Sequence, residues 1–384
     1  MNNNNLDRPA VVCAAAGSGT AAILIFATMP VLVGGMADRY QLTDMQSGLI
    51  ATLYFSTYAL TALTSPLWIR RVNWRLLSGC GFGLMVVSII AALSVSSFDA
   101  SRIAIAASGL GAGLLYPVSL SLVSDMQQTE RVYAIKLAVE QLVPAALLML
   151  LSIGALATSG LPGTMTAILI TLVLCIFASV AMPRRGAHTT AGDHGMAGGL
   201  SLGLLALLAL AVNFSGFAGL WVFIERIAVD RGFESDFINT WIAVGLITSG
   251  IGPLMAAVLA DRFGRTAPIL LSTAAALASM TLLAGEVTSS HYALALILLP
   301  LTYYFGISYL FSIVVDTDTS GRISGLMSFA LAVGSAVGPG IFGALKSSDG
   351  PVLTLMAACI ASGAIVFIFI NARVAATVGV NPND

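Results

Sequence analysis

The stretch "LADRFGR" (residues 259–265) decides the fold, because it places three charged side chains between two long apolar runs. A companion stretch, "PLWIRRVNWR" (residues 66–75), lies between two apolar runs of the first half of the chain. Charge is scarce elsewhere: 9% of the 384 residues are charged and 58% are hydrophobic. Soluble domains carry about 25% charged residues. The composition therefore indicates an all-α integral membrane protein.

Apolar runs long enough to cross a bilayer recur along the whole chain, since a spanning helix needs about 20 apolar residues. Stretches rich in glycine, proline or charge separate them. The sequence therefore predicts twelve transmembrane helices. The runs are 10–34, 46–69, 76–97, 101–124, 132–156, 164–182, 200–224, 237–259, 267–286, 292–315, 322–345 and 351–372.

The distribution of Lys and Arg among the short loops predicts the orientation, because cytoplasmic loops carry the excess. If both termini are cytoplasmic, that side holds most of the 17 basic residues. We therefore expect a multi-pass protein of the cytoplasmic (inner or plasma) membrane. The basic residues on the cytoplasmic side are then Arg8, Arg70, Arg71, Arg75, Arg131, Lys136, Arg184, Arg185, Arg262, Arg265, Arg322 and Arg373.

The two charged stretches reveal an internal repeat. Aligning Arg70 with Asp261 shifts the chain by almost half its length and carries the first apolar run onto the seventh. Six helices are thus followed by six equivalent ones, an arrangement typical of transporters with a site at the membrane midplane. We predict an N-terminal six-helix bundle (1–182), a cytoplasmic linker (183–199) and a C-terminal six-helix bundle (200–384).

Residues 261–265, Asp-Arg-x-Gly-Arg, resemble the cytoplasmic loop signature of the major facilitator superfamily. The copy in the first half departs from this pattern, with Pro66 in place of Gly, Arg70 in place of Asp and Asn73 in place of the second Gly. Because Asn tolerates the left-handed conformation that Gly usually supplies, we expect Asn73 to preserve the bend. "GLGAGLLYP" (109–117) and "GSAVGPGIFG" (334–343) resemble two further glycine-rich motifs of the family. The resemblance implies the fold of that family, with two pseudo-symmetric six-helix bundles, and secondary transport by alternating access.

The resemblance also implies a gate at the cytoplasmic end, where the loop aspartate meets the start of a helix from the opposite half. In this chain the gate would have its charges exchanged, with Asp261 near Arg131 and Arg70 near Asp316 or Asp318. The alternative is that the arginines only follow the positive-inside bias. Three further arginines belong to the same loops: Arg75, Arg262 and Arg265.

Glu140 is the only acidic residue deep within an apolar run. It follows Arg131 by nine residues, which places it roughly 13 Å into the membrane at 1.5 Å per residue. Burial disfavours the charged form of a carboxyl group, and an ionisable side chain at this depth is a functional candidate. We expect Glu140 to couple protons or to pair with a cationic group of the solute. The alternative is that Lys136, one helical turn earlier, neutralises Glu140 in an ion pair.

Other polar and aromatic side chains recur at similar depth and suit a pocket for a small organic solute with an apolar body. Trp221 and Trp241 fall near helix ends, so we expect them in the aromatic belt at the membrane surface. The polar candidates for the pocket are Tyr54, Tyr58, Gln141, Asn213, Tyr303 and Tyr304.

The remaining patterns exclude several classes of function. No G-x-x-x-x-G-K-[ST] loop for nucleotides and no H-E-x-x-H, paired-carboxylate or nucleophile-base pattern occurs, which argues against an ATP-driven pump and an enzyme. The net charge of −1 argues against a nucleic-acid partner. The four cysteines lack metal-site spacing. We expect a monomer in the lipid bilayer, without cofactor or metal, that moves a small organic solute and is coupled to protons through Glu140. The alternatives are a drug or metabolite exporter that works by proton antiport, and a membrane sensor that binds a ligand without transporting it.

Overall fold

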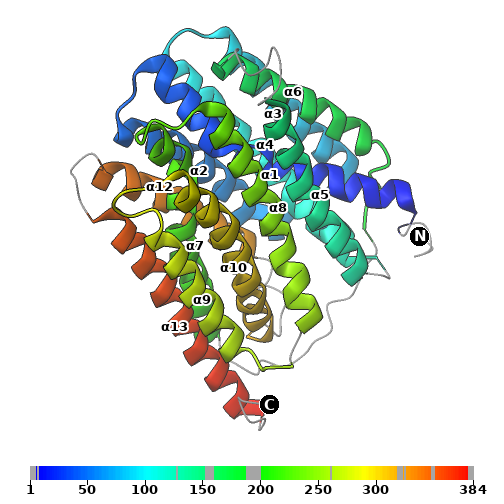
Figure 1. Ribbon diagram of the computed structural model, residues 1–384. Helices are drawn as coiled ribbons and strands as arrows, with labels where there is room; N and C mark the ends of the chain where they lie inside the picture. Colours follow the sequence, from blue (N-terminus) through cyan, green and yellow to red (C-terminus); the bar gives the residue numbers. More distant parts are fainter. Residues whose placement is uncertain are drawn as a thin grey trace.

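The computed structural model describes residues 6, 8–126, 129–151, 160–186, 200–259, 262–317, 323, 326–346 and 351–378. Within these residues the chain forms α-helices and no strand, and the long helices pack side by side (Figure 1). The helices are α1 (Pro9–Tyr40), α2 (Asp44–Trp68), α3 (Trp74–Ser94), α4 (Phe98–Ser124), α5 (Thr129–Leu151), α6 (Gly160–Ala178), α7 (Leu200–Val229), α8 (Ser235–Leu259), α9 (Thr266–Thr281), α10 (Ser289–Asp316), α12 (Met327–Lys346) and α13 (Val352–Val378).

Each helix corresponds to one of the twelve apolar runs, which confirms the predicted all-helical fold class. Nine helices of the described residues are long and apolar enough to cross a membrane. The helix ends differ from the predicted ends where a helix continues through charged residues. The first run was predicted to end at residue 34, but α1 continues to Tyr40 and stops at Gln41, which adopts a left-handed conformation with φ of 51°.

Local capping interactions fix where several helices begin. Thr43 and Gln46 form a reciprocal capping box at the start of α2. The Asn73 Oδ1 atom accepts hydrogen bonds from the backbone N–H groups of Arg75 and Leu76 and so caps α3. Asn73 has φ of −70°, so the prediction that it adopts the left-handed conformation is wrong. The reason is that α3 begins directly after Asn73, whereas Gly264, with φ of 60°, precedes α9 by two residues and makes the turn itself.

Helices from the first half of the chain (α1–α6) pack against helices from the second half (α7–α13) along several lines of contact. α2 lies along α12, and α5 lies along α8 (Figure 1). Gly48 lets the backbone of α2 approach that of α12, because a Cβ atom there would collide with the Pro339 carbonyl oxygen. The Thr52 hydroxyl donates a 2.7 Å hydrogen bond to the Ala336 carbonyl across the same contact.

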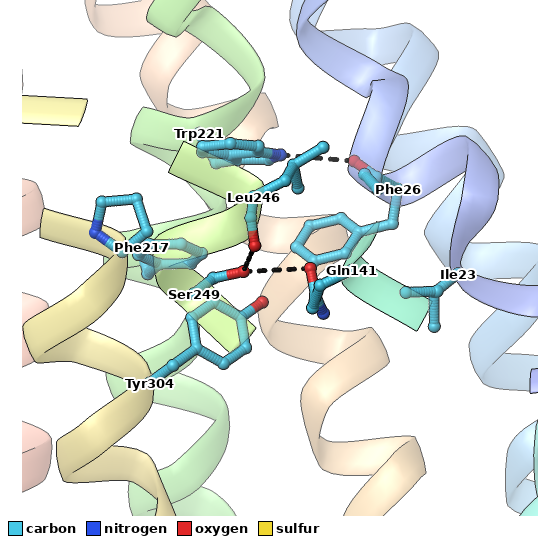
Figure 2. A pocket seen from close by; sticks show the side chains of 10 residues that line it. Ile23, Phe26, Gln141, Phe217, Trp221, Leu246, Ser249 and Tyr304 are labelled. Carbon is cyan, nitrogen blue, oxygen red and sulfur yellow. Dashed lines mark hydrogen bonds between the residues drawn. The ribbon is translucent and has the colours of Figure 1, made fainter. Parts of the chain in front are cut away.

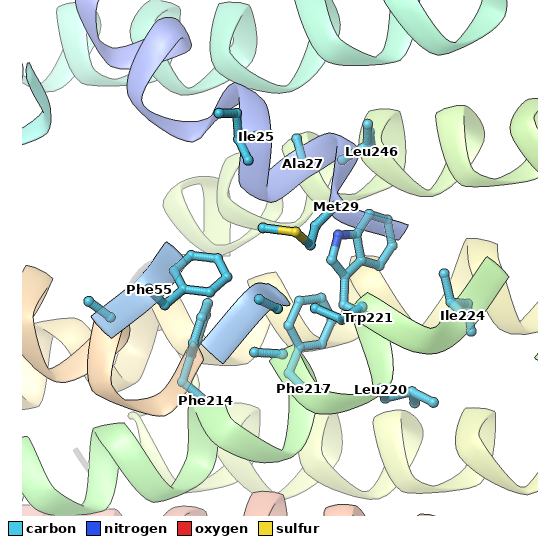
Figure 3. Close-up of a cluster of buried hydrophobic side chains, with 14 of the residues drawn as sticks. Ile25, Ala27, Met29, Phe55, Phe214, Phe217, Leu220, Trp221, Ile224 and Leu246 are labelled. Atoms are coloured by element: carbon cyan, nitrogen blue, oxygen red, sulfur yellow. The ribbon is translucent and has the colours of Figure 1, made fainter. Parts of the chain in front are cut away.

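The largest apolar cluster extends through most of the bundle, and one part of it lies between α1, α2, α7 and α8. Side chains from both halves interdigitate there, among them Met29, Phe55, Phe217 and Trp221 (Figure 3). This cluster brings aromatic residues of the second half against the middle of α1. It therefore forms one wall of the space that the two halves enclose.

The ends of the helices form two groups of opposite character. We call the end that carries Arg70, Arg75 and Arg265 the arginine end, because the loops there are rich in arginine. The opposite end carries Asp38 and Asp230, and we call it the acidic end. α1 runs from the arginine end to the acidic end, and successive helices alternate in direction.

Candidate functional site

A small pocket lies between the two halves, in the middle of the bundle (Figure 2). Its cavity volume is about 10 Å³, room for about one water molecule, and most of its wall is apolar or aromatic. α1 and α5 contribute one side, and α7, α8 and α10 contribute the other. The lining residues are Ile23, Phe26, Ala27, Gln141, Phe217, Trp221, Leu246, Ser249, Pro300 and Tyr304.

The aromatic wall of the pocket is held rigidly by stacking. The ring of Phe217 stacks on that of Tyr303, with centroids 4.2 Å apart and planes 9° apart. Phe217 also lies nearly parallel to Trp221, at 6.0 Å and 11°. The Tyr303 hydroxyl donates a 2.8 Å hydrogen bond to Asn213 Oδ1, and Asn213 Nδ2 donates one of 2.8 Å to the Ile360 carbonyl. Tyr303 and Asn213 therefore fix the wall from behind.

Two hydrogen bonds cross the pocket from one half to the other. Trp221 Nε1 donates to the Phe26 carbonyl oxygen at 3.3 Å. Ser249 Oγ donates to Gln141 Oε1 at 3.0 Å (Figure 2). The expectation that Trp221 lies in the aromatic belt is wrong, because its indole is buried between the halves. The sequence shows the apolar run but not the direction in which this side chain points.

Glu140 lies beside the pocket and is paired with Lys136 in a fully buried ion pair. The ring of Tyr116 lies 4.6 Å from Lys136 Nζ, in a cation–π arrangement. Gly19 of α1 gives the pair its space, because a Cβ atom there would collide with the Glu140 carboxylate. The structure thus contains the ion pair that the sequence left as an alternative. A role of Glu140 in proton coupling stays a prediction.

The other predicted pocket residues divide into two groups. Gln141 and Tyr304 line the pocket, and Tyr304 interacts electrostatically with Glu140. Tyr54 and Tyr58 are buried and do not line it. Tyr58 also interacts electrostatically with Glu140. Two of the predicted tyrosines, Tyr58 and Tyr304, thus lie within electrostatic reach of the Glu140 carboxylate.

At the arginine end, the described ion pairs lie within each half. Arg70 Nη1 is 2.6 Å from Asp125 Oδ2, and both residues belong to the first half. Asp316 is paired with Arg265, and both belong to the second half. The predicted pairing of Arg70 with Asp316 is therefore not found. Asp125 lies closer to Arg70 than Asp316 does, because Asp125 ends α4 and α4 packs beside α2. The repeat alignment compared the two halves and did not consider contacts within one half.

The remaining gate residues of the prediction are placed as follows. Arg75 Nε donates a 3.0 Å hydrogen bond to the Met182 carbonyl oxygen, again within the first half. Arg262 is exposed. Asp261, Asp318 and the side chain of Arg131 lie outside the described residues. Their predicted roles in a gate stay predictions.

At the acidic end, ion pairs join the two halves, and the sequence analysis missed them. Arg226 of α7 donates to Asp38 Oδ1 of α1 at 2.8 Å and to the Gly34 carbonyl at 3.0 Å. It also holds Glu225 with two hydrogen bonds of 2.7 and 3.0 Å. Gly34 accommodates this group, because a Cβ atom there would collide with the Glu225 carboxylate. The side chains of Glu225 and Arg226 are 12% and 11% exposed.

A second basic residue, Lys346 of α12, joins the halves beside Arg226. Its Nζ atom is 3.0 Å from Asp44 Oδ1 of α2 and 2.7 Å from Asp230 Oδ2. The two groups border one polar cavity of about 440 Å³. The sequence held one signal for this network, the adjacent pair Glu225 and Arg226. Because the seventh run was predicted to end at residue 224, the pair was read as a loop, whereas α7 continues to Val229. We call these six residues the acidic-end network: Asp38, Asp44, Glu225, Arg226, Asp230 and Lys346.

The described residues offer little for a metal. They contain no group of three or more His, Cys, Asp or Glu side chains that could hold a metal ion. The four cysteines, Cys13, Cys80, Cys175 and Cys359, are free thiols. What the site presents is therefore an aromatic pocket, a buried ion pair beside it, and a charged network at one end.

Comparison with known proteins gives one family and a set of solved structures. The model of the Major Facilitator Superfamily matches residues 14–339. No curated protein matches the sequence at a significant level.

Among solved structures, a D-xylose-proton symporter is similar with a TM-score of 0.76 and 11% sequence identity, covering 94% of this chain and 96% of that one. A bacterial homologue of the human lysosomal transporter Spinster, in an inward-facing and occupied conformation, has a TM-score of 0.64 and 16% identity, covering 95% of each chain. The transporter FucP, in the outward conformation, has a TM-score of 0.61 and 15% identity, covering 95% of this chain and 99% of that one. At these identities the likeness concerns the fold.

Proposed function

The chain belongs to the Major Facilitator Superfamily, and we propose on this premise that it is a secondary transporter working by alternating access. It moves a small organic solute across the cytoplasmic membrane, as a monomer with both termini in the cytoplasm. The two moving bodies are residues 1–182 and 200–384, joined by residues 183–199. The arginine end is then cytoplasmic, in agreement with the positive-inside rule.

The observation that carries the proposal is the different placement of ion pairs at the two ends. At the acidic end Arg226 and Lys346 tie the two halves together. At the arginine end the two ion pairs that the structure describes, Arg70 with Asp125 and Arg265 with Asp316, each lie within one half. A protein that exposes a central site to one side at a time needs such an asymmetry. We infer that this state is closed toward the outside.

Coupling to protons is assigned to Glu140. Its carboxylate is buried and forms an ion pair with Lys136. It also interacts electrostatically with Tyr58 and Tyr304. A proton on Glu140 would remove the charge that holds Lys136, so protonation and the contacts around the pocket are linked. Gln141, next in sequence, carries this change to the pocket, since it binds Ser249 of the opposite half.

The test uses purified protein in proteoliposomes supplied with a metabolite mixture and a pH gradient, with the lumenal contents identified by mass spectrometry. Wild-type protein should accumulate at least one solute, and Glu140→Gln should abolish accumulation while solute exchange without a gradient persists. Glu234→Gln, at an exposed position of the acidic end, is the matched control and should behave as wild type.

Two results would contradict the proposal in different ways. Undiminished accumulation by Glu140→Gln would remove this residue from the coupling mechanism. If the wild-type protein binds a solute but neither accumulates nor exchanges it, the chain is a sensor and not a transporter.

A further inference from the structure

We propose that the pocket between the two halves binds one water molecule, and that this water and the Tyr304 hydroxyl form the route by which protons reach Glu140. The inference rests on the proposed function and adds a proton path to the coupling residue named there. Three observations carry it: the volume of the cavity, the polar groups that line it, and the electrostatic contact of Tyr304 with Glu140.

The cavity has the volume of a single water site. It measures about 10 Å³, and a buried water needs roughly 10–15 Å³ of such space together with two to four polar partners. The space is therefore too small for an organic solute while the halves are in this arrangement. A solute could enter only after the halves have moved apart.

Three polar side chains line the cavity from the two halves: Gln141 of α5, Ser249 of α8 and Tyr304 of α10 (Figure 2). The Ser249 hydroxyl has one proton and two acceptors within reach, Gln141 Oε1 at 3.0 Å and the Leu246 carbonyl oxygen at 2.6 Å. Its oxygen can still accept a hydrogen bond. Within the described part of the chain, neither the Gln141 Nε2 group nor the Tyr304 hydroxyl has a hydrogen-bond partner.

These groups match the hydrogen-bonding capacity of one water molecule. Gln141 Nε2 and the Tyr304 hydroxyl would donate to the water oxygen, and the water would donate to Ser249 Oγ. Buried waters typically make about three hydrogen bonds. The remaining polar group of the wall, the Trp221 N–H, already donates to the Phe26 carbonyl oxygen. The rest of the wall is apolar, so the water has one defined place.

Tyr304 connects this water site to Glu140. The residues that line the cavity include Tyr304 and not Glu140, and Tyr304 interacts electrostatically with the Glu140 carboxylate. A phenol group both donates and accepts a hydrogen bond, so it can pass a proton on without becoming charged. When an excess proton arrives on the water, the Tyr304 oxygen accepts it while the Tyr304 hydrogen moves to Glu140. The products are a neutral Glu140, an intact Tyr304 and a neutral water.

The water site depends on both halves, because Gln141 belongs to the first half, and Ser249 and Tyr304 belong to the second. When the halves part on one side of the membrane, bulk water from that side reaches the same position. Glu140 can then exchange protons only with the side that is open. The route therefore follows the alternation of access that the proposed function requires.

The first experiment detects the water without any solute. X-ray hydroxyl-radical footprinting of purified protein in nanodiscs oxidises side chains next to ordered water, and mass spectrometry gives the rate at each residue. Phe217 lines the cavity and is 2% exposed, whereas Phe223 of the same helix is 0% exposed, stacks on Phe342 and does not line the cavity. Phe217 should be oxidised several-fold faster than Phe223. Equal rates would overturn the inference.

Two variants assign the water to its partners. Tyr304→Phe keeps the ring and removes the hydroxyl, and Ser249→Ala removes the acceptor, so in each the oxidation of Phe217 should slow to the rate of Phe223. Tyr40→Phe is the matched control, because it removes a tyrosine hydroxyl that does not line the cavity. Fast oxidation of Phe217 in both folded variants would overturn the assignment. If one variant fails to fold, the other variant and the comparison within wild-type protein still decide.

Time-resolved infrared spectroscopy after a pH jump follows the proton to Glu140. The C=O band of the protonated carboxyl group is assigned to Glu140 by its absence in Glu140→Gln. The band should rise about a hundredfold more slowly in Tyr304→Phe, which is the lower range of what a positioned proton-transfer group contributes. In Tyr40→Phe the band should rise as in wild type. An unchanged rate in folded Tyr304→Phe would overturn the route.

Failure of this inference differs from failure of the proposed function. If accumulation depends on Glu140 but its band rises equally fast without the Tyr304 hydroxyl, the coupling assignment holds and the route is wrong. If the water and the band behave as proposed but no solute is accumulated or exchanged, the proton path holds and the transport assignment is wrong. If no Glu140 band follows the pH jump, both the coupling role and the route are wrong.

Discussion

The two ends of the bundle use the same chemistry in opposite ways. At the acidic end, Arg226 and Lys346 bind carboxylates of the other half, so the ion pairs resist separation of the halves. At the arginine end, Arg70 and Arg265 bind carboxylates of their own half, so the ion pairs stabilise each half by itself. The difference teaches that the number of salt bridges says little about a gate. What matters is whether a pair crosses the surface along which the halves move.

The strongest way to break this contrast is to remove Arg226. Arg226→Leu deletes four hydrogen bonds and leaves the Glu225 carboxylate buried without its partner, so we expect a loss of about 3 kcal/mol in stability. The acidic end should also open. The measurement is labelling of Ser47→Cys, a buried position at this cavity, by a membrane-impermeant maleimide in a background without the native cysteines.

Two further variants distinguish the effect of an unpaired buried charge at Glu225 from the effect of losing the contact between the two halves. In the double variant Glu225→Gln with Arg226→Leu, the buried Glu225 carboxylate no longer carries an unpaired charge. The stability should therefore recover, whereas the maleimide should still label residue 47 as fast as in Arg226→Leu alone. Arg226→Lys keeps the charge but loses the two-pronged geometry of the guanidinium, and should give intermediate labelling. Slow labelling in Arg226→Leu would mean that this residue does not hold the end closed.

At the arginine end, removal of Arg70 should destabilise the protein without opening the acidic end. Arg70→Ala removes an ion pair that lies within the first half, and it leaves the Asp125 carboxylate, 1% exposed, without the Arg70 guanidinium. We expect a cost of about 2 kcal/mol and unchanged labelling at residue 47. Arg70→Glu should be rescued by Asp125→Arg and not by Asp316→Arg, as judged by melting temperature. Rescue by Asp316→Arg would instead indicate that the pairing first predicted from the sequence forms in another state.

A methyl group added to Gly34 tests the acidic end by packing instead of charge. In Gly34→Ala the new Cβ atom collides with the Glu225 carboxylate, so α1 and α7 should separate slightly at a cost of about 1–2 kcal/mol. Labelling at residue 47 should rise, but less than in Arg226→Leu. Gly83→Ala is the control, because its Cβ atom would meet nothing within 4 Å. Equal labelling in the two glycine variants would argue against the close contact at Gly34.

Lys346 should contribute least to the contrast. Its two ion pairs involve partly exposed side chains, and such pairs are worth about 0–1 kcal/mol. Lys346→Ala should therefore change the melting temperature little, and high salt should reproduce most of its effect on labelling. A larger effect than that of Arg226→Leu would reverse the order of importance within the acidic-end network.

The helices could be predicted from the sequence because the membrane sets their length and apolar character. The run at 101–124, for example, corresponds to α4, which ends at Ser124 and begins three residues earlier, where the Ser97 hydroxyl caps it. The ends at the acidic side were harder, since α1 and α7 continue through charged residues to Tyr40 and Val229. Charge marks where a helix meets water, but it does not stop the helix.

The site was predictable only where depth in the membrane was the deciding property. Glu140 and Gln141 were identified because polar side chains at that depth are rare, and both lie at or beside the pocket. Trp221 was misplaced and Phe217 was missed, because an aromatic residue in an apolar run gives no sign of which way it faces. The predicted pairing of Arg70 with Asp316 was not found for a related reason: the repeat alignment compares the two halves and gives no sign that Asp125 lies next to Arg70 within the folded first half.

The hydrogen bond from Trp221 to Phe26 also makes the indole a natural optical reporter. Its ring is buried at the surface where the halves meet, so its fluorescence should be blue-shifted while the halves stay together and should move to longer wavelength when water enters between them. The other three tryptophans, Trp68, Trp74 and Trp241, belong to contacts within one half. Stopped-flow emission from a variant that keeps only Trp221 would therefore time the conformational cycle without any attached dye.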